Sequence, residues 1–407
     1  MLTYFPTPYP NEWWYSVLCR YHVRSGNAKN QTTMLDLFGG DTTVSLAAVY
    51  PNNTIRKTLA QLPQNMLQYD EIVCRHTLFS YYLRFYTEQE KRNILGGLRR
   101  GENIVITGIR KYAEVQNWHP RYCPQCAAAD AKQYGEPYWH IDHQIPLLTI
   151  CPIHGCRVIS VQALRLSKMG HTFLPLSNIL ASEEDKADHT ACDLAQWDKS
   201  LSQILYDYFA LPLSVGKTDG YNNIAITLAN MGYESIQCSS PHTILQTKRL
   251  YQDLNIFFGK EVVEKIIGSE SNVNVINRLG KWTMKAPERY ALLQCFAGLE
   301  SGIVFGRRIQ SKLETALRIL YRAKKTYTKR EIMNRLNITS YQLDTLLRKY
   351  HLSPFWRGTA NTENKHRLQC ELTDSEYAAY KQALAVSGIR KEGDFIRQCI
   401  LTSIHYP

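Results

Sequence analysis

The sequence of 407 residues lacks the features that mark membrane and secreted proteins. No run approaches the roughly twenty apolar residues that a membrane-spanning helix needs, and the N-terminus has no secretory signal pattern. The eleven cysteines are odd in number and irregularly spaced, which argues against a disulfide framework. We therefore expect a soluble, cytoplasmic protein that does not engage a membrane.

Signatures of common enzymes are also missing. The sequence has no P-loop, no nucleophile elbow and no acidic triad with catalytic spacing, which predicts a protein that is not an enzyme. One alternative is a zinc nuclease with His140, Asp142 and His143 as its catalytic cluster. We favour a structural role for these three residues beside a metal site.

Strand patterns are scarce and internal repeats are absent, whereas helical periodicity is common. The sequence therefore predicts a mainly α, multidomain fold. The first helix is expected over residues 13–21, with Pro10 and Asn11 at its start. Further helices are expected at residues 33–38, 58–61, 72–82, 88–97, 194–209, 241–254, 260–267 and 290–299.

Two short knuckles of cysteine and histidine are the most informative feature that is present. Cys123-x-x-Cys126 and Cys151-x-x-His154 have the spacing of a tetrahedral zinc site, and each knuckle contains a proline that favours the turn. Four protein ligands leave no position for water, so we predict a structural rather than a catalytic Zn²⁺. Cys156, next to the second knuckle, is an alternative ligand.

The basic charge is concentrated in one stretch. The net charge of the chain is +12, and residues 307–357 contain thirteen lysines and arginines against three acidic residues, Glu314, Glu331 and Asp344. A surface that served only solubility would mix charges of both signs. The stretch therefore predicts a face that binds the phosphates of double-stranded DNA.

Two capping boxes in this stretch predict a helix-turn-helix. Thr328 with Glu331, and Thr339 with Gln342, each begin a short helix, and Asn337 lies in the turn between the helices. In this motif the N-terminal half of the second helix enters the major groove. The predicted DNA-binding residues are Ser340, Tyr341, Gln342, Thr345 and Arg348 at the groove, with Lys329, Arg330, Lys349 and Arg357 at phosphates. The alternative is a helical hairpin with a solvated basic face.

The last forty or so residues have a different pattern. Apolar and polar residues alternate over 367–372 as in a strand, and two helices are expected after it, one beginning with the capping box of Thr373 and Glu376 and one at 393–403. This order resembles the ribbon-helix-helix family, in which Arg367 and Gln369 would enter the major groove. A single strand is unstable alone, so the interpretation requires a homodimer or a partner strand. The alternative is a small α/β cap on the helix-turn-helix.

The N-terminus and the zinc module together resemble the TniQ/TnsD family. Phe5-Pro-Thr-Pro-Tyr-Pro-Asn-Glu12 is similar to the family hallmark Phe-Pro-x-Pro-x-x-x-Glu, which leads into the first helix. The Arg-Tyr-Cys-Pro-x-Cys and Cys-Pro-x-His-Gly runs resemble its zinc module. By this resemblance the zinc ligands are Cys123, Cys126, Cys151 and His154. The good match covers about residues 3–160, and a weaker one reaches about residue 350.

The resemblance also divides the chain. We expect a TniQ-like helical domain at 1–118, a zinc-knuckle module at 119–180, a TnsD-like helical domain at 190–305, the basic helix-turn-helix at 306–360 and the tail at 361–407.

Target-site selection in DNA transposition is what the resemblance implies. TnsD-type proteins bind an attachment site and recruit the AAA+ ATPase TnsC, whereas shorter TniQ proteins join a CRISPR effector complex and use its guide RNA. Our first hypothesis is a nucleoid-associated, DNA-binding target-site selector of a TnsABC-type transposon, with the aromatic segment 5–21 as one surface for TnsC. The alternative is an adaptor that couples a CRISPR effector complex to transposition. The capped second helix favours the first hypothesis, and the length of the chain favours the second.

Overall fold

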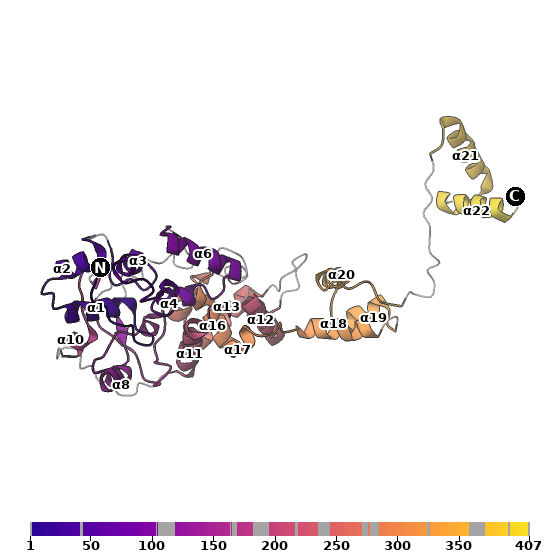
Figure 1. Ribbon diagram of the computed structural model, residues 1–407. Helices are drawn as coiled ribbons and strands as arrows, with labels where there is room; N and C mark the ends of the chain where they lie inside the picture. The colour runs from indigo at the N-terminus through magenta and orange to yellow at the C-terminus, as the bar shows by residue number, and fades with distance from the viewer. Residues whose placement is uncertain are drawn as a thin grey trace.

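The computed structural model describes residues 2–40, 44–102, 104, 119–162, 164, 169–181, 195–215, 219–234, 245–270, 276, 285–323, 326–357, 371–389 and 391–405. Over these residues the fold is mainly α-helical, as predicted, with one sheet of two short strands (Figure 1). No helix in this part of the chain combines the length and the apolar character needed to cross a membrane.

Six helices form the N-terminal region within the described residues. They are α1 (Trp14–Ser25), α2 (Asn30–Phe38), α3 (Asn53–Gln61), α4 (Tyr69–Arg75), α5 (Phe79–Tyr82) and α6 (Glu88–Arg100). The helices expected at 33–38, 58–61 and 88–97 lie within α2, α3 and α6. The first helix begins one residue later than predicted, at Trp14, after Asn11 adopts a positive φ of 51°.

The prediction of one helix over residues 72–82 was wrong. The chain turns between α4 and α5, where the Thr77 hydroxyl donates to the Val73 carbonyl at 2.5 Å and accepts the amide of Phe79 at 3.2 Å. These side-chain bonds replace the backbone ladder and end α4.

The cysteine-rich region follows and packs on the N-terminal helices. It contains β1 (Arg121–Tyr122), α8 (Pro124–Tyr134), the 3₁₀ turn η1 (Asp142–Gln144), β2 (Ile159–Ser160) and α10 (Leu176–Ala181), with β1 antiparallel to β2. The Trp13 amide donates to the Trp139 carbonyl at 2.8 Å, and the Ile141 amide donates to the Asn11 carbonyl at 2.9 Å. These bonds join segments on the two sides of the domain boundary that we expect between residues 118 and 119. That boundary stays a prediction.

The middle of the chain completes the main core. Its helices are α11 (Gln196–Ala210), α12 (Asp219–Leu228), the π-helical turn η3 (Ala229–Tyr233), α13 (Thr247–Phe258), α14 (Lys260–Ile266), α16 (Pro287–Phe296) and α17 (Ser301–Val304). The buried guanidinium of Arg84 donates to the carbonyls of Tyr208 at 2.7 Å and Leu211 at 2.6 Å, which joins α11 to the N-terminal region. One buried core therefore contains residues from Phe5 to Val304.

Three helices beyond this core form a unit with its own apolar core. They are α18 (Lys312–Arg322), α19 (Lys329–Leu336) and α20 (Ser340–Lys349), and we call them the basic three-helix unit. Both predicted capping boxes are present, and Asn337 ends α19 with a φ of 52°. The separate core contains Leu317, Leu320, Ile332, Ile338, Leu343, Leu346, Leu347, Tyr350 and Phe355.

The tail contains two helices, α21 (Asp374–Ser387) and α22 (Glu392–His405), which lie apart from the other labelled helices (Figure 1). The capping box at Thr373 is present, as predicted. Most of the expected strand, including Arg367 and Gln369, lies outside the described residues, and Glu371 and Leu372 are not in a strand. None of the residues of α21 is buried.

Candidate metal centre and nucleic-acid interface

Three sulfur atoms and one imidazole meet between α8 and the loop that follows η1. Cys123 precedes α8, and its sulfur accepts the amide of Cys126 at 3.4 Å, while Pro124 occupies the first turn. The second knuckle turns back through a Gly155 amide that donates to the Cys151 carbonyl at 2.7 Å. Gly155 has a φ of 67°, a conformation that glycine adopts at little cost.

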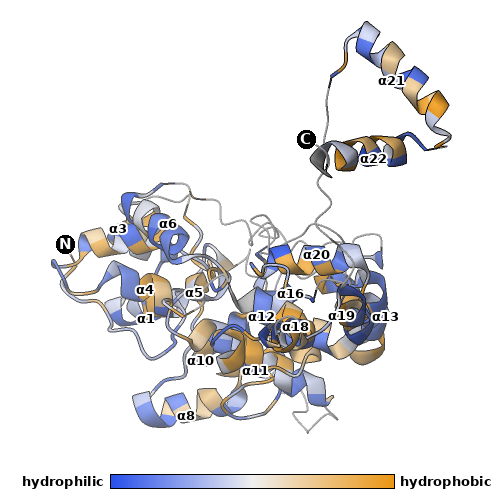
Figure 2. Ribbon diagram, turned by 90° about the vertical axis from the view of Figure 1, so that its right-hand side faces the viewer, coloured by the Kyte–Doolittle hydropathy of each residue, from blue (hydrophilic) through white to orange (hydrophobic). Residues whose placement is uncertain are grey.

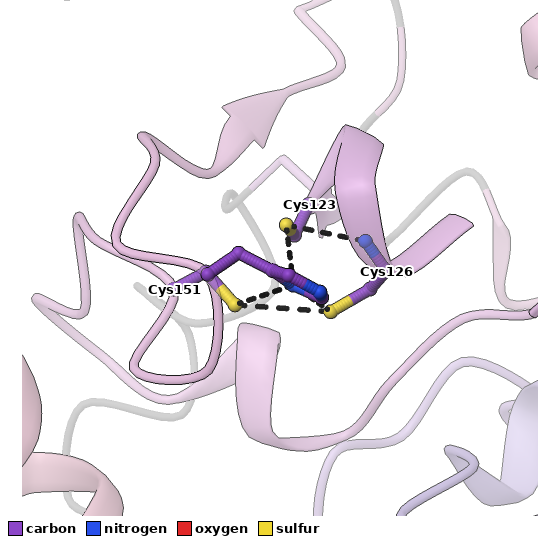
Figure 3. A group of neighbouring side chains, drawn as sticks. Cys123, Cys126 and Cys151 are labelled. Carbon is purple, nitrogen blue, oxygen red and sulfur yellow. Dashed lines mark hydrogen bonds between the residues drawn. The ribbon is translucent and has the colours of Figure 1, made fainter. Parts of the chain in front are cut away.

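The four predicted ligands lie at distances that suit a tetrahedral ion. Their ligand atoms all lie within 4.8 Å of one another, and the sulfur atoms face each other in Figure 3. The sulfur atoms of Cys126 and Cys151 are 3.7 Å apart, and His154 Nδ1 lies 3.2 Å and 3.7 Å from them. Zinc–sulfur bonds of about 2.3 Å in a tetrahedron place two sulfurs about 3.8 Å apart. The cluster therefore fits a metal ion of this size.

The three thiols compete for the same hydrogen bonds. Hydrogen bonds with Cys123 and Cys151 raise the pKa of Cys126, whereas hydrogen bonds with Cys123 and Cys126 lower the pKa of Cys151. Without a cation, one thiolate is stabilised by its two neighbours and a second is disfavoured. A bound divalent ion removes this conflict because it stabilises all three thiolates.

Cys156, the alternative ligand, lies beside the cluster. Its sulfur is 3.3 Å from the sulfur of Cys123, and its backbone stabilises the knuckle, because the Cys156 carbonyl accepts the amide of Cys151 at 2.8 Å. The set of four that lie mutually close is nevertheless the predicted one, without Cys156.

The N-terminal motif packs directly against this region. Glu12 is fully buried and accepts the Tyr9 amide at 2.9 Å and Arg20 Nη1 at 2.8 Å. Arg20 also donates to Glu136, which follows α8, at 2.8 Å. No local spacing links positions 20 and 136, so sequence patterns could not have found this contact.

The N-terminal and cysteine-rich regions together match a known family. Residues 3–158 match the TniQ family model. Residues 3–158 thus form a TniQ domain. The transposon Tn7 transposition protein TnsD of Escherichia coli is 27% identical over 179 residues, which cover 42% of this chain and 35% of that relative. The match thus spans about a third of the relative's length.

The aromatic residues of the TniQ domain are mostly core. Phe5, Trp13, Trp14 and Tyr15 are all buried, and the Phe5 ring stacks on Tyr21 with centroids 5.6 Å apart. The expectation that segment 5–21 offers an aromatic surface was therefore wrong for these side chains. They are needed to bury the first helix.

Beside the metal centre, η1 brings together the three residues considered for catalysis. His140, Asp142 and His143 are all buried, and each offers a ligand atom within 4.8 Å of the others. His143 Nε2 also lies 3.7 Å from the sulfur of Cys126.

On the basic three-helix unit, the predicted groove-facing residues lie along one helix. Ser340, Tyr341 and Arg348 are exposed on α20, and Gln342 and Thr345 are half-buried. Gln342 Oε1 accepts the Thr339 amide at 2.7 Å, and the Thr345 hydroxyl donates to the Tyr341 carbonyl at 2.9 Å. Gln342 thus has a structural role at the helix start in addition to its predicted contact with a base.

The predicted phosphate-binding residues have different surroundings. Arg330 and Arg357 are exposed. Lys329 Nζ pairs with the two oxygens of Asp344 at 3.0 and 3.2 Å and lies 4.9 Å from the ring centroid of Trp356. Burial lowers the pKa of Lys349. Their roles at phosphates stay predictions.

One buried carboxylate in this unit was not anticipated. Glu314 is 1% exposed and accepts hydrogen bonds from Arg308 and Arg318, both at 2.9 Å. The spacing of Glu314 and Arg318 on α18 could have indicated the second pair. Two of the thirteen basic side chains are therefore partly neutralised.

Proposed function

We propose that this TniQ-domain protein selects target sites for a TnsABC-type transposon. The basic three-helix unit acts as a helix-turn-helix that reads an attachment site, and the protein recruits the AAA+ regulator TnsC to that site. The protein acts as an adaptor rather than as an enzyme. The likeness to a Tn7 transposition protein supports the transposition role.

The architecture of the basic three-helix unit is the observation that supports the proposal most directly. It has an apolar core of its own, and its second capping box leaves Ser340 and Tyr341 exposed at the N-terminal end of α20. That end of a recognition helix is the part that contacts base edges. The exposed Arg330 and Arg357 supply charge for phosphates beside it.

In this proposal the Cys₃His centre holds a structural Zn²⁺. The ion would bind Cys123, Cys126, Cys151 and His154 and stabilise the fold, with no position left for a reacting water. The bond between Arg20 and Glu136 holds the metal centre against the N-terminal motif.

The tail fits a dimerisation role within the same proposal. Figure 2 shows apolar residues on both α21 and α22, and Tyr377, Val386 and Ile396 are exposed. A second copy that paired its ribbon-helix-helix tail with this one would cover such side chains. Light scattering of the full chain and of a chain ending at residue 360 tests this, because only the full chain should be dimeric.

Recruitment is tested with purified TnsC and immobilised DNA. We expect TnsC to be retained on DNA that carries the attachment site when this protein is present, with no RNA added. Retention that requires a CRISPR effector complex and its guide RNA would instead establish the adaptor alternative.

A further inference from the structure

The cluster of His140, Asp142 and His143 contains three buried polar atoms that lack a partner. The three residues are 7%, 1% and 1% exposed. Among the described residues, His140 Nδ1, Asp142 Oδ1 and His143 Nδ1 have no hydrogen-bond partner. A buried polar atom without a partner costs about 1–3 kcal/mol, so three together need a physical explanation.

The second nitrogen or oxygen atom of each of these three side chains has a neighbouring polar group or sulfur atom. His140 Nε2 lies 2.8 Å from Asp130 Oδ2, so this nitrogen carries the proton and Nδ1 carries the lone pair. Asp142 Oδ2 accepts Asn11 Nδ2 at 3.2 Å, which leaves Oδ1. One atom of each group is thus left unpartnered, and the three groups each offer a ligand atom within 4.8 Å of the others.

The position of the proton on His143 depends on the neighbouring Cys₃His centre. Its Nε2 lies 3.7 Å from the sulfur of Cys126. When Cys126 is a thiolate bound to an ion, it accepts a hydrogen bond from the Nε2–H group, and Nδ1 then carries the lone pair. This step rests on a filled Cys₃His centre.

We propose that His140 Nδ1, Asp142 Oδ1 and His143 Nδ1 form a second metal site, which binds a first-row divalent cation such as Zn²⁺. Two histidines and one carboxylate are a ligand set that such ions accept. Asp130 orients His140 in the way that a carboxylate usually supports a metal-bound histidine. Three protein ligands leave a further position for a water molecule.

The distances favour a cation over a shared proton. His140 Nδ1 and Asp142 Oδ1 are 3.8 Å apart, which exceeds a hydrogen bond. Two ligands at about 2.1 Å from a tetrahedral ion lie about 3.4 Å apart, which is close to this separation. A proton on His140 would also leave His143 Nδ1 without a partner, whereas one ion engages all three atoms.

Charge supports the same conclusion. Three thiolates around one divalent ion have a net charge of about −1, and the buried carboxylates of Asp130 and Asp142 lie on α8 and η1 beside them. A second divalent cation offsets this buried negative charge. The site would hold η1 against the N-terminal segment, to which Asp142 is bonded through Asn11.

The first test is the metal content of the full chain after zinc loading and dialysis. We expect about two zinc ions per chain, and about one in Asp142→Asn, which keeps the shape of the side chain and removes the charged ligand. The control Glu136→Gln alters a carboxylate outside both clusters and should retain about two. A single zinc in the unmodified protein, or two in Asp142→Asn, would overturn the proposal.

A second measurement needs no variant. X-ray absorption at the zinc edge reports the mean number of sulfur ligands per ion. One Cys₃His site together with one site of two histidines and a carboxylate gives about 1.5 sulfurs per zinc, whereas the Cys₃His site alone gives about three. A value near three on the fully loaded protein would exclude the second site.

Discussion

The guanidinium of Arg20 lies 2.8 Å from the carboxylate of Glu12, and the two side chains are 5% and 0% exposed. Glu12 closes the N-terminal motif of the TniQ domain, and Arg20 lies on α1. Because Arg20 also bonds Glu136, this pair joins the motif, the first helix and the cysteine-rich region into one structure. The motif therefore has a structural explanation.

Loss of Arg20 should destabilise the fold strongly. Arg20→Ala leaves Glu12 buried without its partner, and we expect the free energy of unfolding to fall by about 3 kcal/mol or more. Arg24→Ala is the matched control, because Arg24 pairs with the same Glu136 while 41% exposed, and it should cost less than about 1 kcal/mol. Urea unfolding of the zinc-loaded proteins measures both, and equal losses would contradict the account.

Glu12 should also make stability depend on pH. Burial raises the pKa of Glu12 from 4.5 to about 7, despite the opposing charge of Arg20. Since the folded state holds the proton to higher pH than the unfolded state, the contribution of Glu12 is complete below pH 4.5 and is lost as the pH rises through 7. The loss is at most about 3 kcal/mol.

The variant Glu12→Gln isolates this contribution. The difference in unfolding free energy between the unmodified protein and Glu12→Gln should change in favour of Glu12→Gln as the pH rises from about 4.5 to about 7.5. A difference that is constant over this range would show that the Glu12 carboxyl has an ordinary pKa.

Removal of the metal ion should unfold the cysteine-rich region. Binding at such centres contributes on the order of 10 kcal/mol to folding, and all four groups lie close enough to share one ion. We expect Cys126→Ser to lose the thiolate-to-cobalt absorption of the Co²⁺-loaded protein and much of its helical circular dichroism. Cys399→Ser, at an exposed position on α22, should change neither.

Arg348 should contribute to sequence recognition. If Arg348 bonds a base edge, Arg348→Ala weakens specific binding by about 1–3 kcal/mol and leaves binding to random DNA almost unchanged. Arg330→Ala should weaken both equally and lower the salt dependence by about one phosphate contact. Lys260→Ala, a loss of one exposed charge on α14, is the control. An equal loss on both DNAs for Arg348→Ala would reassign this residue to the backbone.

Local patterns predicted much of this fold from the sequence. Capping boxes at Thr328, Thr339 and Thr373 act within four residues, so the helix starts could be located without tertiary information. The knuckle spacing likewise singled out four residues whose side chains the fold brings close enough to hold one ion.

Contacts between residues far apart in the sequence limited what could be predicted from it. The break between α4 and α5 depends on Thr77 and on the Leu78 amide, which donates to the Val49 carbonyl at 2.6 Å. The partners of Arg20 and His140 are likewise fixed by how α1, α8 and η1 pack. Periodicity and spacing carry no information about such contacts.

The central claim is that this protein reads DNA by itself, and selection from a pool of random double-stranded DNA tests it most directly. The zinc-loaded full chain is bound at near-physiological salt, and the retained DNA is sequenced. The account predicts an enriched motif of about a dozen base pairs or more, as a dimeric reader of two half-sites would select. Retained DNA without any enriched motif would contradict it, and the basic three-helix unit would then hold DNA that another machine has selected.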